Sequence, residues 1–401
     1  AARVTGSDGQ VGMFGFSYLG ATQLLAATTR PPSLKAIVPG FTASQYFDGW
    51  TYNSGAFALG FNCYWANLLA MDTAARNQNI SDLEELSLSL GSASNWFWST
   101  PLKNYPPLKS KSADYFFDWL AHPTYDEYWK RWSIDEDYSR IDVPALHIAG
   151  WYDIFLSGSV NNFCGISRDG GSANTRNHQK LLIGPWTHMP WSPVGNTGKT
   201  EPSTSEIDDW TIRWFDEILK NKNTGILDSP ITIYPVNGNL LELEKWHTGE
   251  SPTETWFFHS EGRANSKFGD GKLDKYSPAD EHVDLFVSDP TIPIQSNGGH
   301  SCCFDSITPM GPADQHTSES SRMVLIYTSE EFAKETLIIG DAQIIVYASS
   351  SALDSDFVAR LCEVTADGIS TNIQEGIIRA KYRNSLTNPQ PVEPNTVDRK
   401  S

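Results

Sequence analysis

Residues 10–20 read Gln-Val-Gly-Met-Phe-Gly-Phe-Ser-Tyr-Leu-Gly, and they are the strongest indication of the architecture. The first part, Gln10 to Phe14, is short and apolar, which predicts a buried strand that ends in a tight turn at Gly15. From Tyr18 to Thr29 the chain is rich in Leu, Ala and Gln and stops before two prolines, which predicts a helix. A second apolar strand follows at residues 34–38. Strand, helix and strand in about 30 residues form a βαβ unit, so we expect a parallel sheet covered by helices.

The composition of the 401 residues limits the classes of protein to which the chain can belong. Hydrophobic residues make up 39% and aromatic residues 12%, which excludes a disordered chain, and no apolar run approaches the roughly 18 residues of a membrane span. The 48 acidic and 30 basic residues leave a net charge of −18. Phosphate contacts need clustered Lys and Arg, so nucleic acid is excluded as the main ligand. We expect a soluble protein of two or three packed units.

The cysteines indicate neither a disulfide framework nor a metal centre. They are five in number, they lack Cys-x-x-Cys spacing, and they lie at Cys63, Cys164, Cys302, Cys303 and Cys362. His300 stands near the adjacent pair, but adjacent cysteines rarely supply tetrahedral geometry alone. We therefore expect no metal and no organic cofactor.

The pattern changes between residues 49 and 140 to helical segments dense in aromatic residues, which predicts a helical cap inserted over the sheet. Residues 81–84, Ser-Asp-Leu-Glu, predict the start of one of its helices through a capping box. The aromatic side chains could form a core or wall an apolar pocket. They include Tyr64, Trp65, Trp96, Phe97, Trp98, Tyr115, Phe116, Phe117, Trp119, Tyr128, Trp129 and Trp132.

Sheet strands return at residues 143–150 and 180–184, two continuous apolar runs that end in Gly. Residues 154–179 leave room for a crossover helix, and Ile207 to Lys220 has helical spacing. Beyond residue 228 the chain predicts strands with turns between them, at residues 231–234, 254–258, 323–327, 342–347 and 357–361. These predict an all-β sandwich after a linker near residues 221–225. The expected division is 1–48 and 141–227 for the α/β core, 49–140 for the cap and 228–401 for the sandwich.

Ser17 is the candidate nucleophile. It sits where a strand turns sharply into a helix, so its hydroxyl can be held above the sheet, with the backbone N–H of Tyr18 facing an oxyanion. Gly15 supplies the small residue that this turn needs. The segment departs from the simple Gly-x-Ser-x-Gly pattern, because Leu19 stands at the last position and glycine is delayed to Gly20. The alternative is a serine that caps the helix.

Two further side chains follow strand ends and complete a candidate triad. A serine hydroxyl needs an adjacent base that is oriented by a carboxylate. Asp153 comes directly after the strand that ends near Gly150, and His188 comes after the next strand. The chain order Ser, Asp, His is that of α/β-hydrolases. His147 lies inside a strand and is expected to be a core histidine.

Three segments carry a resemblance to a known family: Gly-Phe-Ser-Tyr-Leu-Gly at 15–20, Gly-Trp-Tyr-Asp at 150–153 and Gly-Pro-Trp-Thr-His at 184–188. They resemble the signatures of the X-Pro dipeptidyl-peptidase and cocaine-esterase family of hydrolases. Residues 356–361 and 378–383 are similar to its C-terminal jelly roll. The resemblance covers nearly the whole chain. It implies an α/β-hydrolase core, a helical cap and a jelly-roll domain.

The resemblance also implies roles: Ser17 as nucleophile, Asp153 as orienting acid, His188 as base, and the Tyr18 N–H in the oxyanion hole. The family carries several strands before the nucleophile, one of which supplies an oxyanion-hole tyrosine, whereas this chain starts just ahead of Ser17. Residues 384–401 are polar and rich in proline where the last jelly-roll strands are expected. We therefore expect a fragment, truncated at the N-terminus and also at the C-terminus.

The hypothesis that follows is acyl transfer from an ester, amide or short peptide to water, without a cofactor. An X-Pro dipeptidyl-peptidase or an α-amino acid ester hydrolase or acylase is the alternative in the same class. Either would need carboxylates to hold a free α-amine, for which Asp114, Asp118 and Glu127 are candidates. A non-catalytic glycan-binding protein is the alternative of another class. The compartment and the oligomeric state are not indicated.

Overall fold

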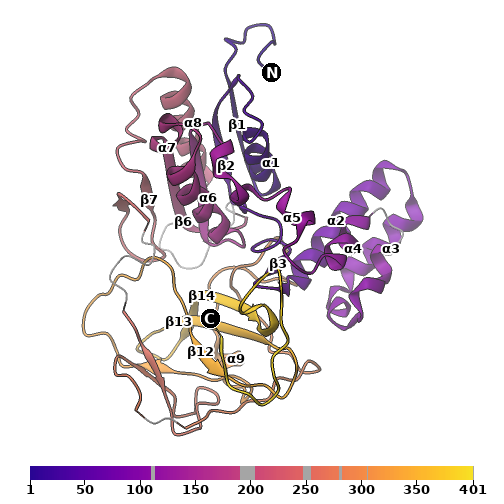
Figure 1. Ribbon diagram of the computed structural model, residues 1–401, viewed down its shortest axis with the longest axis vertical. Coiled ribbons are helices and arrows are strands. Elements are labelled where there is room, and N and C mark those ends of the chain that lie inside the picture. Colours follow the sequence, from indigo (N-terminus) through magenta and orange to yellow (C-terminus); the bar gives the residue numbers. More distant parts are fainter. Residues whose placement is uncertain (110–112, 190–203, 247–253, 280–281, 305, 401) are drawn as a thin grey trace.

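A six-stranded sheet forms the centre of the N-terminal half, in the order β1-β2-β5-β6-β7-β8. The computed structural model describes residues 1–109, 113–189, 204–246, 254–279, 282–304 and 306–400. In Figure 1 the sheet and its helices lie above a β-rich C-terminal region, and a lobe of helices projects to one side. The sheet strands are β1 (Val11–Phe16), β2 (Leu34–Gly40), β5 (Ala145–Tyr152), β6 (Gln179–Thr187), β7 (Ile231–Ile233) and β8 (Leu241–Leu243).

Successive residues of a strand point to opposite faces of the sheet, and in these strands both sets are apolar. Helices therefore cover both faces. On one face Ile37 of β2 shares a buried cluster with Leu24 of α1 and Ile166 of α6. On the other face Val38 packs in a cluster with Trp214 of α8. The helix predicted in the first βαβ unit is α1 (Tyr18–Ala27). The helix predicted between residues 154 and 179 is present as α6 (Leu156–Asp169) and α7 (Ala173–Asn177), and the one predicted at 207–220 is α8 (Thr204–Lys220).

The strand at residues 231–234 was expected to open the sandwich, and this is wrong. β7 pairs in parallel with β6, and β8 pairs antiparallel with β7, so both extend the α/β sheet. Ile231 and Ile233 are buried in one cluster with Leu181 and Ile183 of β6. Three residues of Ile-Thr-Ile suit either kind of strand, because so short an apolar run carries no periodicity that separates the two.

The lobe that projects in Figure 1 consists of helices, with β3 (Tyr52–Asn53) and β4 (Ala56–Phe57) forming a small hairpin at its base. Its α-helices are α2 (Leu59–Arg76), α3 (Ile80–Gly91), α4 (Asp114–Ala121) and α5 (Glu127–Lys130), and short 3₁₀ helices lie between α3 and α4. The predicted capping box at Ser81 is wrong. Asn79 caps α3 instead, and its side chain accepts the N–H of Asp82 at 3.2 Å. Most of the lobe's aromatic residues form core, as Trp96 and Phe116 do, whereas Trp98 is exposed.

The C-terminal region is β-rich, and the strands in its described residues form three small sheets. The predicted strand at 323–327 is reduced to a single bridge at Leu325 followed by β11, which pairs with β10. The longest pair, β13 with β14, runs antiparallel from Asp356 opposite Arg379. The elements are β9 (Phe257–His259), β10 (Lys272–Asp274), α9 (His316–Glu319), β11 (Thr328–Ser329), β12 (Val346–Ala348), β13 (Asp356–Val364), β14 (Ser370–Arg379) and β15 (Asp398–Lys400).

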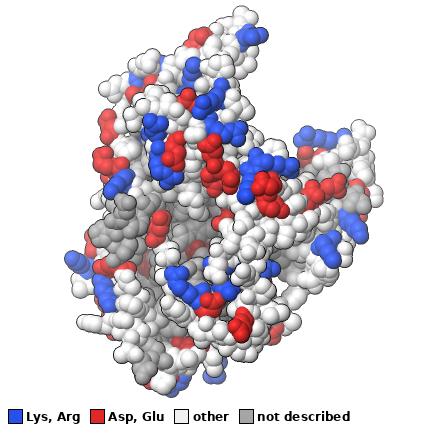
Figure 2. All heavy atoms as spheres, in the orientation of Figure 1, with Lys and Arg blue, Asp and Glu red and all other residues white. Residues whose placement is uncertain are grey.

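Two further features of the molecule are the charged side chains on its surface and the apolarity of its helices. On the face drawn in Figure 2, basic and acidic side chains are interspersed. None of the helices in the described parts of the chain combines the length and the apolarity that crossing a bilayer requires.

Candidate active site

The backbone at the junction of β1 and α1 presents Ser17. Its φ of 61° and ψ of −133° form a strained conformation for a residue with a Cβ, which is the kind of turn that exposes a nucleophile above a sheet. Gly15 has a φ of 144°, and a Cβ there would lie 2.9 Å from the Cβ of Leu19, so the turn requires glycine. The Ser17 side chain makes no capping hydrogen bond to α1. This argues against the alternative of a helix-capping serine.

Ser17, His188 and Asp153 form one continuous chain of hydrogen bonds. The distance from His188 Nε2 to Ser17 Oγ is 3.0 Å, and the distance from His188 Nδ1 to Asp153 Oδ1 is 2.7 Å. The His188 and Asp153 side chains are 3% and 0% exposed, so bulk water hardly competes for these bonds. The structure thus brings together three side chains that the sequence separates by up to 171 positions.

The parallel pairing of β5 and β6 explains why the acid and the base meet. Tyr152, the last residue of β5, pairs with Thr187, the last residue of β6. The next residue of each strand is therefore delivered to the same edge of the sheet. A register shift after Gly150 turns the end of β5, and a Cβ on Gly150 would lie 2.2 Å from the carbonyl oxygen of Trp186. Only glycine fits this approach.

His147, the histidine inside a strand, is a core residue, as predicted. His147 lies within β5, is 1% exposed, and has its Nε2 3.0 Å from the side-chain oxygen of Gln179. Burial lowers the pKa of His147 to about 4, because the charged imidazolium loses its hydration. A neutral histidine held in this way is a core residue. The predicted oxyanion donor, Tyr18, is the first residue of α1, where helical N–H groups have no partner within the helix.

Family models match both halves of the chain. Residues 1–190 match the X-Pro dipeptidyl-peptidase (S15) family, and residues 196–398 match the C-terminal non-catalytic domain of X-Pro dipeptidyl-peptidases. The chain belongs to the S15 family of serine hydrolases. It is 30% identical over 399 residues to the cocaine esterase of Rhodococcus sp. (strain MB1 Bresler), covering 96% of this chain and 68% of the esterase. Membership in an enzyme family does not favour the glycan-binding alternative.

Further relatives agree with this placement. A putative serine esterase of Mycobacterium bovis is 21% identical, with 96% of this chain and 63% of that protein covered. Among solved structures, an α-amino acid ester hydrolase has a TM-score of 0.72 at 21% identity, and an aminopeptidase from a marine sediment archaeon (Thaumarchaeota) has 0.69 at 20% identity. Each comparison covers 99% of this chain and 66% of the solved one, and it shows a shared fold. The S15 chain thus spans about two thirds of the length of these relatives.

A loop of the β-rich region contacts Asp153 and the strand before it, and the sequence did not predict this contact. His300 Nε2 lies 2.6 Å from the carbonyl oxygen of Trp151, and Ser301 forms a backbone bridge with Asp153. Gly299 has a φ of 104°, and a Cβ there would lie 2.3 Å from the carboxylate of Glu375. The Gly-Gly pair before His300 was the one signal of this tight approach.

The His300 side chain is half-buried in this contact. Burial lowers its pKa, while the nearby carboxylates of Glu375 and Asp153 oppose that shift. Since Nε2 faces the carbonyl oxygen of Trp151, it carries the proton, and Nδ1 has no hydrogen-bond partner among the described atoms. The ring therefore donates one hydrogen bond to the end of β5, two residues ahead of Asp153.

Two cysteines follow this histidine and approach the base of the triad. Cys302 and Cys303 are joined in a disulfide between neighbouring residues, which the sequence did not predict. The three other cysteines, Cys63, Cys164 and Cys362, are free. Within the described part of the chain, one set of three His, Cys, Asp or Glu residues has a spacing that could hold a metal ion, and it consists of His188, Cys302 and Cys303.

Apolar side chains from the lobe and from the sheet surround the triad. Phe155, which precedes α6, lies edge-on to the His188 ring with 5.1 Å between centroids. Phe61 and Trp65 of α2 belong to the same cluster as Phe155 and Cys302. The Tyr18 ring lies 5.8 Å from that of Trp65. Part of the predicted aromatic cap therefore lies beside Ser17 and His188, as an apolar acyl pocket would require.

The three candidate carboxylates of the lobe are not at the site. Asp114 and Asp118 are exposed on α4, and Glu127 pairs with Lys130 at 3.0 Å. In the described structure none of the three makes a hydrogen bond or ion pair with a triad residue.

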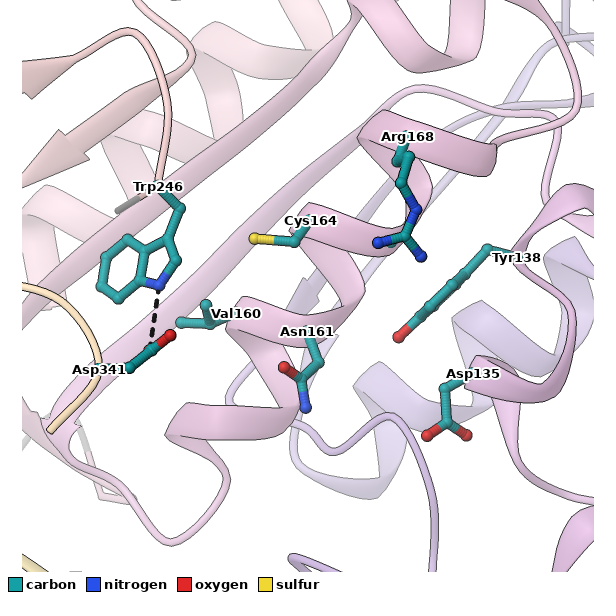
Figure 3. Close-up of a pocket in the computed structure, with 9 residues that line it drawn as sticks. Asp135, Tyr138, Val160, Asn161, Cys164, Arg168, Trp246 and Asp341 are labelled. Carbon is teal, nitrogen blue, oxygen red and sulfur yellow. Dashed lines mark hydrogen bonds between the residues drawn. The ribbon is translucent and has the colours of Figure 1, made fainter. Parts of the chain in front are cut away.

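A separate cavity of about 310 Å³ lies along α6. Figure 3 shows Tyr138 and Arg168 on one side of it, with Trp246 and its hydrogen-bonded partner Asp341 on the other. Its lining includes no triad residue, so this cavity is not the place where Ser17 would meet an acyl group.

Proposed function

We propose that the protein containing this chain hydrolyses carboxylic esters or amides through an acyl-enzyme on Ser17. The observation that carries the proposal is the unbroken series of hydrogen bonds from Ser17 Oγ through His188 to Asp153, with the last two side chains almost fully buried. A hydroxyl becomes a competent nucleophile when an oriented base accepts its proton. Family membership independently supports a serine hydrolase.

The geometry supports a two-step mechanism. As Ser17 Oγ attacks the substrate carbonyl carbon, His188 Nε2 accepts the hydroxyl proton, and Asp153 holds the imidazole in the tautomer with a proton on Nδ1. The developing oxyanion is stabilised by the Tyr18 N–H at the positive end of α1. His188 then protonates the leaving group. In the second step a water molecule, deprotonated by the same imidazole, releases the acyl group from Ser17.

We propose small esters or amides with an apolar acyl group as the substrate class. The apolar side chains of Phe61, Trp65 and Phe155 near His188 support this choice. Dipeptidyl-peptidase activity and α-amino acid ester hydrolysis need carboxylates for a free α-amine, and the exposed Asp114, Asp118 and Glu127 are poorly suited to that task. The names of the relatives include both an esterase and an α-amino acid ester hydrolase, so both substrates belong in the test.

We also propose how the chain divides. The α/β-hydrolase core takes residues 1–48 and 141–243, which corrects the predicted end at 227, and the lobe at 49–140 is its cap. The β-rich residues from 254 onward form a jelly-roll domain. The pairing of β7 and β8 with the central sheet supports the later boundary.

The test of the function is Ser17→Ala in the full-length protein. We expect kcat for a chromogenic aryl ester to fall by roughly 10⁴–10⁶-fold, with loss of fluorophosphonate labelling. Ser172→Ala, which removes a helix-capping serine far from the triad, is the matched control and should keep labelling. Hydrolysis of an X-Pro-anilide is measured beside the aryl ester to separate the two substrate classes. Wild-type turnover by Ser17→Ala, or labelling at another serine, would overturn the assignment.

A further inference from the structure

Two sulfur atoms lie beside the imidazole that the proposed mechanism uses as its base. The side-chain donor atoms of His188, Cys302 and Cys303 are all within 4.8 Å of one another. Cys302 is 1% exposed and packs with Phe61 and Phe155, which also surround the triad. Neither cysteine has a part in ester hydrolysis. The two sulfurs, one on a buried residue and one on a half-buried residue, are therefore a feature that the hydrolase chemistry leaves unexplained.

We propose that, once their disulfide is reduced, Cys302 and Cys303 bind one zinc-group cation together with His188, and that this ion switches the hydrolase off. The second half of this proposal rests on the proposed function. Two thiolates and one imidazole are a ligand set that Zn²⁺ and Cd²⁺ favour, and the fourth position is left to water. Ligands of one tetrahedral zinc ion lie roughly 3.5–4 Å apart, so the two sulfurs must move apart once their disulfide is broken, whereas the imidazole already lies within 4.8 Å of both.

The hydrogen bond between His188 and Asp153 prepares the imidazole to act as a ligand. His188 Nδ1 bonds to Asp153 Oδ1 at 2.7 Å, so Nε2 is the nitrogen with a lone pair to offer. A carboxylate behind a histidine raises the basicity of the ligating nitrogen and fixes the ring. Asp153 Oδ2 is buried and has no hydrogen-bond partner among the described atoms, so a nearby cation would also stabilise its charge.

The same nitrogen cannot serve both purposes. His188 Nε2 lies 3.0 Å from Ser17 Oγ and must accept the proton of that hydroxyl during attack. A cation bound to Nε2 occupies the lone pair, so Ser17 keeps its proton and the first step stops. Metal binding and acyl transfer are therefore mutually exclusive at this atom, and inhibition follows occupancy directly.

The oxidation state of the cysteine pair decides whether the site exists. A dithiol reductant supplies two electrons and two protons, which break the S–S bond and leave two thiols, while the reductant itself becomes a disulfide. The cation then displaces one proton from each thiol, so its affinity rises with pH. In the oxidised chain both sulfurs are engaged in the disulfide, and only the imidazole remains.

The experiment uses the full-length protein, reduced with dithiothreitol and then desalted without oxygen. In one titration Cd²⁺ is added while the ultraviolet thiolate-to-metal absorption band is followed. In a second titration Zn²⁺ is added and the rate of aryl ester hydrolysis is measured at each concentration. We expect the band to saturate at one equivalent, and EDTA to restore activity. Cys302→Ser and Cys303→Ser should each weaken cation binding by at least about tenfold. Cys164→Ser, at a half-buried free cysteine on α6, is the matched control and should bind like the parent.

Each outcome decides one part of the proposal. Equal Zn²⁺ inhibition of the oxidised and reduced protein, or of both cysteine variants and the parent, would overturn the site. A Cd²⁺ band of undiminished affinity in His188→Ala would place the ion away from the imidazole and would also overturn it. If the proposed hydrolase function fails, the protein shows no esterase activity before metal is added. In that case the Cd²⁺ absorption band still tests the metal site without any activity, because it should require reduced cysteines and His188.

Discussion

The central sheet and the C-terminal β region hold their parts of the site by different means. The sheet buries continuous apolar clusters on both faces, which include the fully buried Trp186 and Trp214. In the described residues from 254 onward, the buried apolar side chains are few: Ala264, Cys302, Ala380, Tyr382 and Val392. Ser17, Asp153 and His188 emerge from the well-packed sheet. The β region reaches them with one loop.

That loop is positioned by polar contacts instead of a large core. Arg360 pairs with Glu375 at 2.8 Å, and the same carboxylate accepts the backbone N–H of His300 at 3.0 Å. Asn372, three residues before Glu375 on β14, accepts the N–H of Ala313 at 2.7 Å. Such networks specify a unique geometry when every group is paired. The difference teaches that the sheet supplies the three side chains of the proposed triad, and that the β region contacts the segment of one of them, Asp153.

The largest effect is expected from a substitution of Asp153, the carboxylate that the central sheet positions. In Asp153→Asn the side chain no longer holds the His188 tautomer that can accept the Ser17 proton, so kcat should fall by about 10⁴-fold. The control is Asp142→Asn, an acid at the opposite end of β5 that bonds to Thr175. Steady-state kinetics on the aryl ester measure both. If Asp153→Asn kept a tenth of the activity or more, the sheet edge would not hold the acid of the reaction.

A smaller effect tests the restraint from the β region. His300→Leu removes the hydrogen bond to the carbonyl oxygen of Trp151, so the Asp153 loop should shift and kcat fall by roughly 10²-fold. The Michaelis constant should change little, since His300 touches no substrate in this scheme. His300→Gln can place an N–H near the same oxygen and should recover most of kcat. Equal losses in the two variants would mean that His300 matters only for packing.

Packing density offers a third way to sharpen the comparison. A Cβ on Gly158 of α6 would lie 2.4 Å from Cα of Ala43, whereas a Cβ on Gly376 of β14 would meet nothing within 4 Å. We expect Gly158→Ala to lower the free energy of unfolding by about 2 kcal/mol. Gly376→Ala should stay within about 0.5 kcal/mol of the parent. Denaturant melts measure both, and a similar loss in the two variants would contradict the contrast.

The smallest effect is a pH dependence of the sheet core. Burial lowers the folded-state pKa of His147 to about 4, below the unfolded value of about 6.5, so the unfolded chain binds more protons between these values. Stability from this group is therefore complete above pH 6.5 and is lost as the pH falls toward 4, by about 1 kcal/mol between pH 7 and 5.5. His147→Gln should flatten this part of the stability profile. An unchanged slope would show that His147 titrates normally.

Much of the α/β half could be predicted because its strands and chemistry are local in sequence. Val11 to Phe16 and Ala145 to Tyr152 are strands whose ends carry or precede Ser17 and Asp153, and the parallel pairing then follows from the βαβ pattern. The β region was harder. Its short strands made the predicted strand at 323–327 too long. The three residues of β7 were assigned to this region by prediction, although they belong to the central sheet.

By itself, the amino-acid sequence determined which three side chains could form a triad, because strand ends, a strained glycine turn and the order Ser, Asp, His are all written locally. Only the tertiary structure decided that His300 bonds to the strand that carries the acid, and that Cys302 and Cys303 lie beside His188. Those contacts join residues more than a hundred positions apart. No local periodicity encodes such a contact, since it depends on how one folded region docks on another.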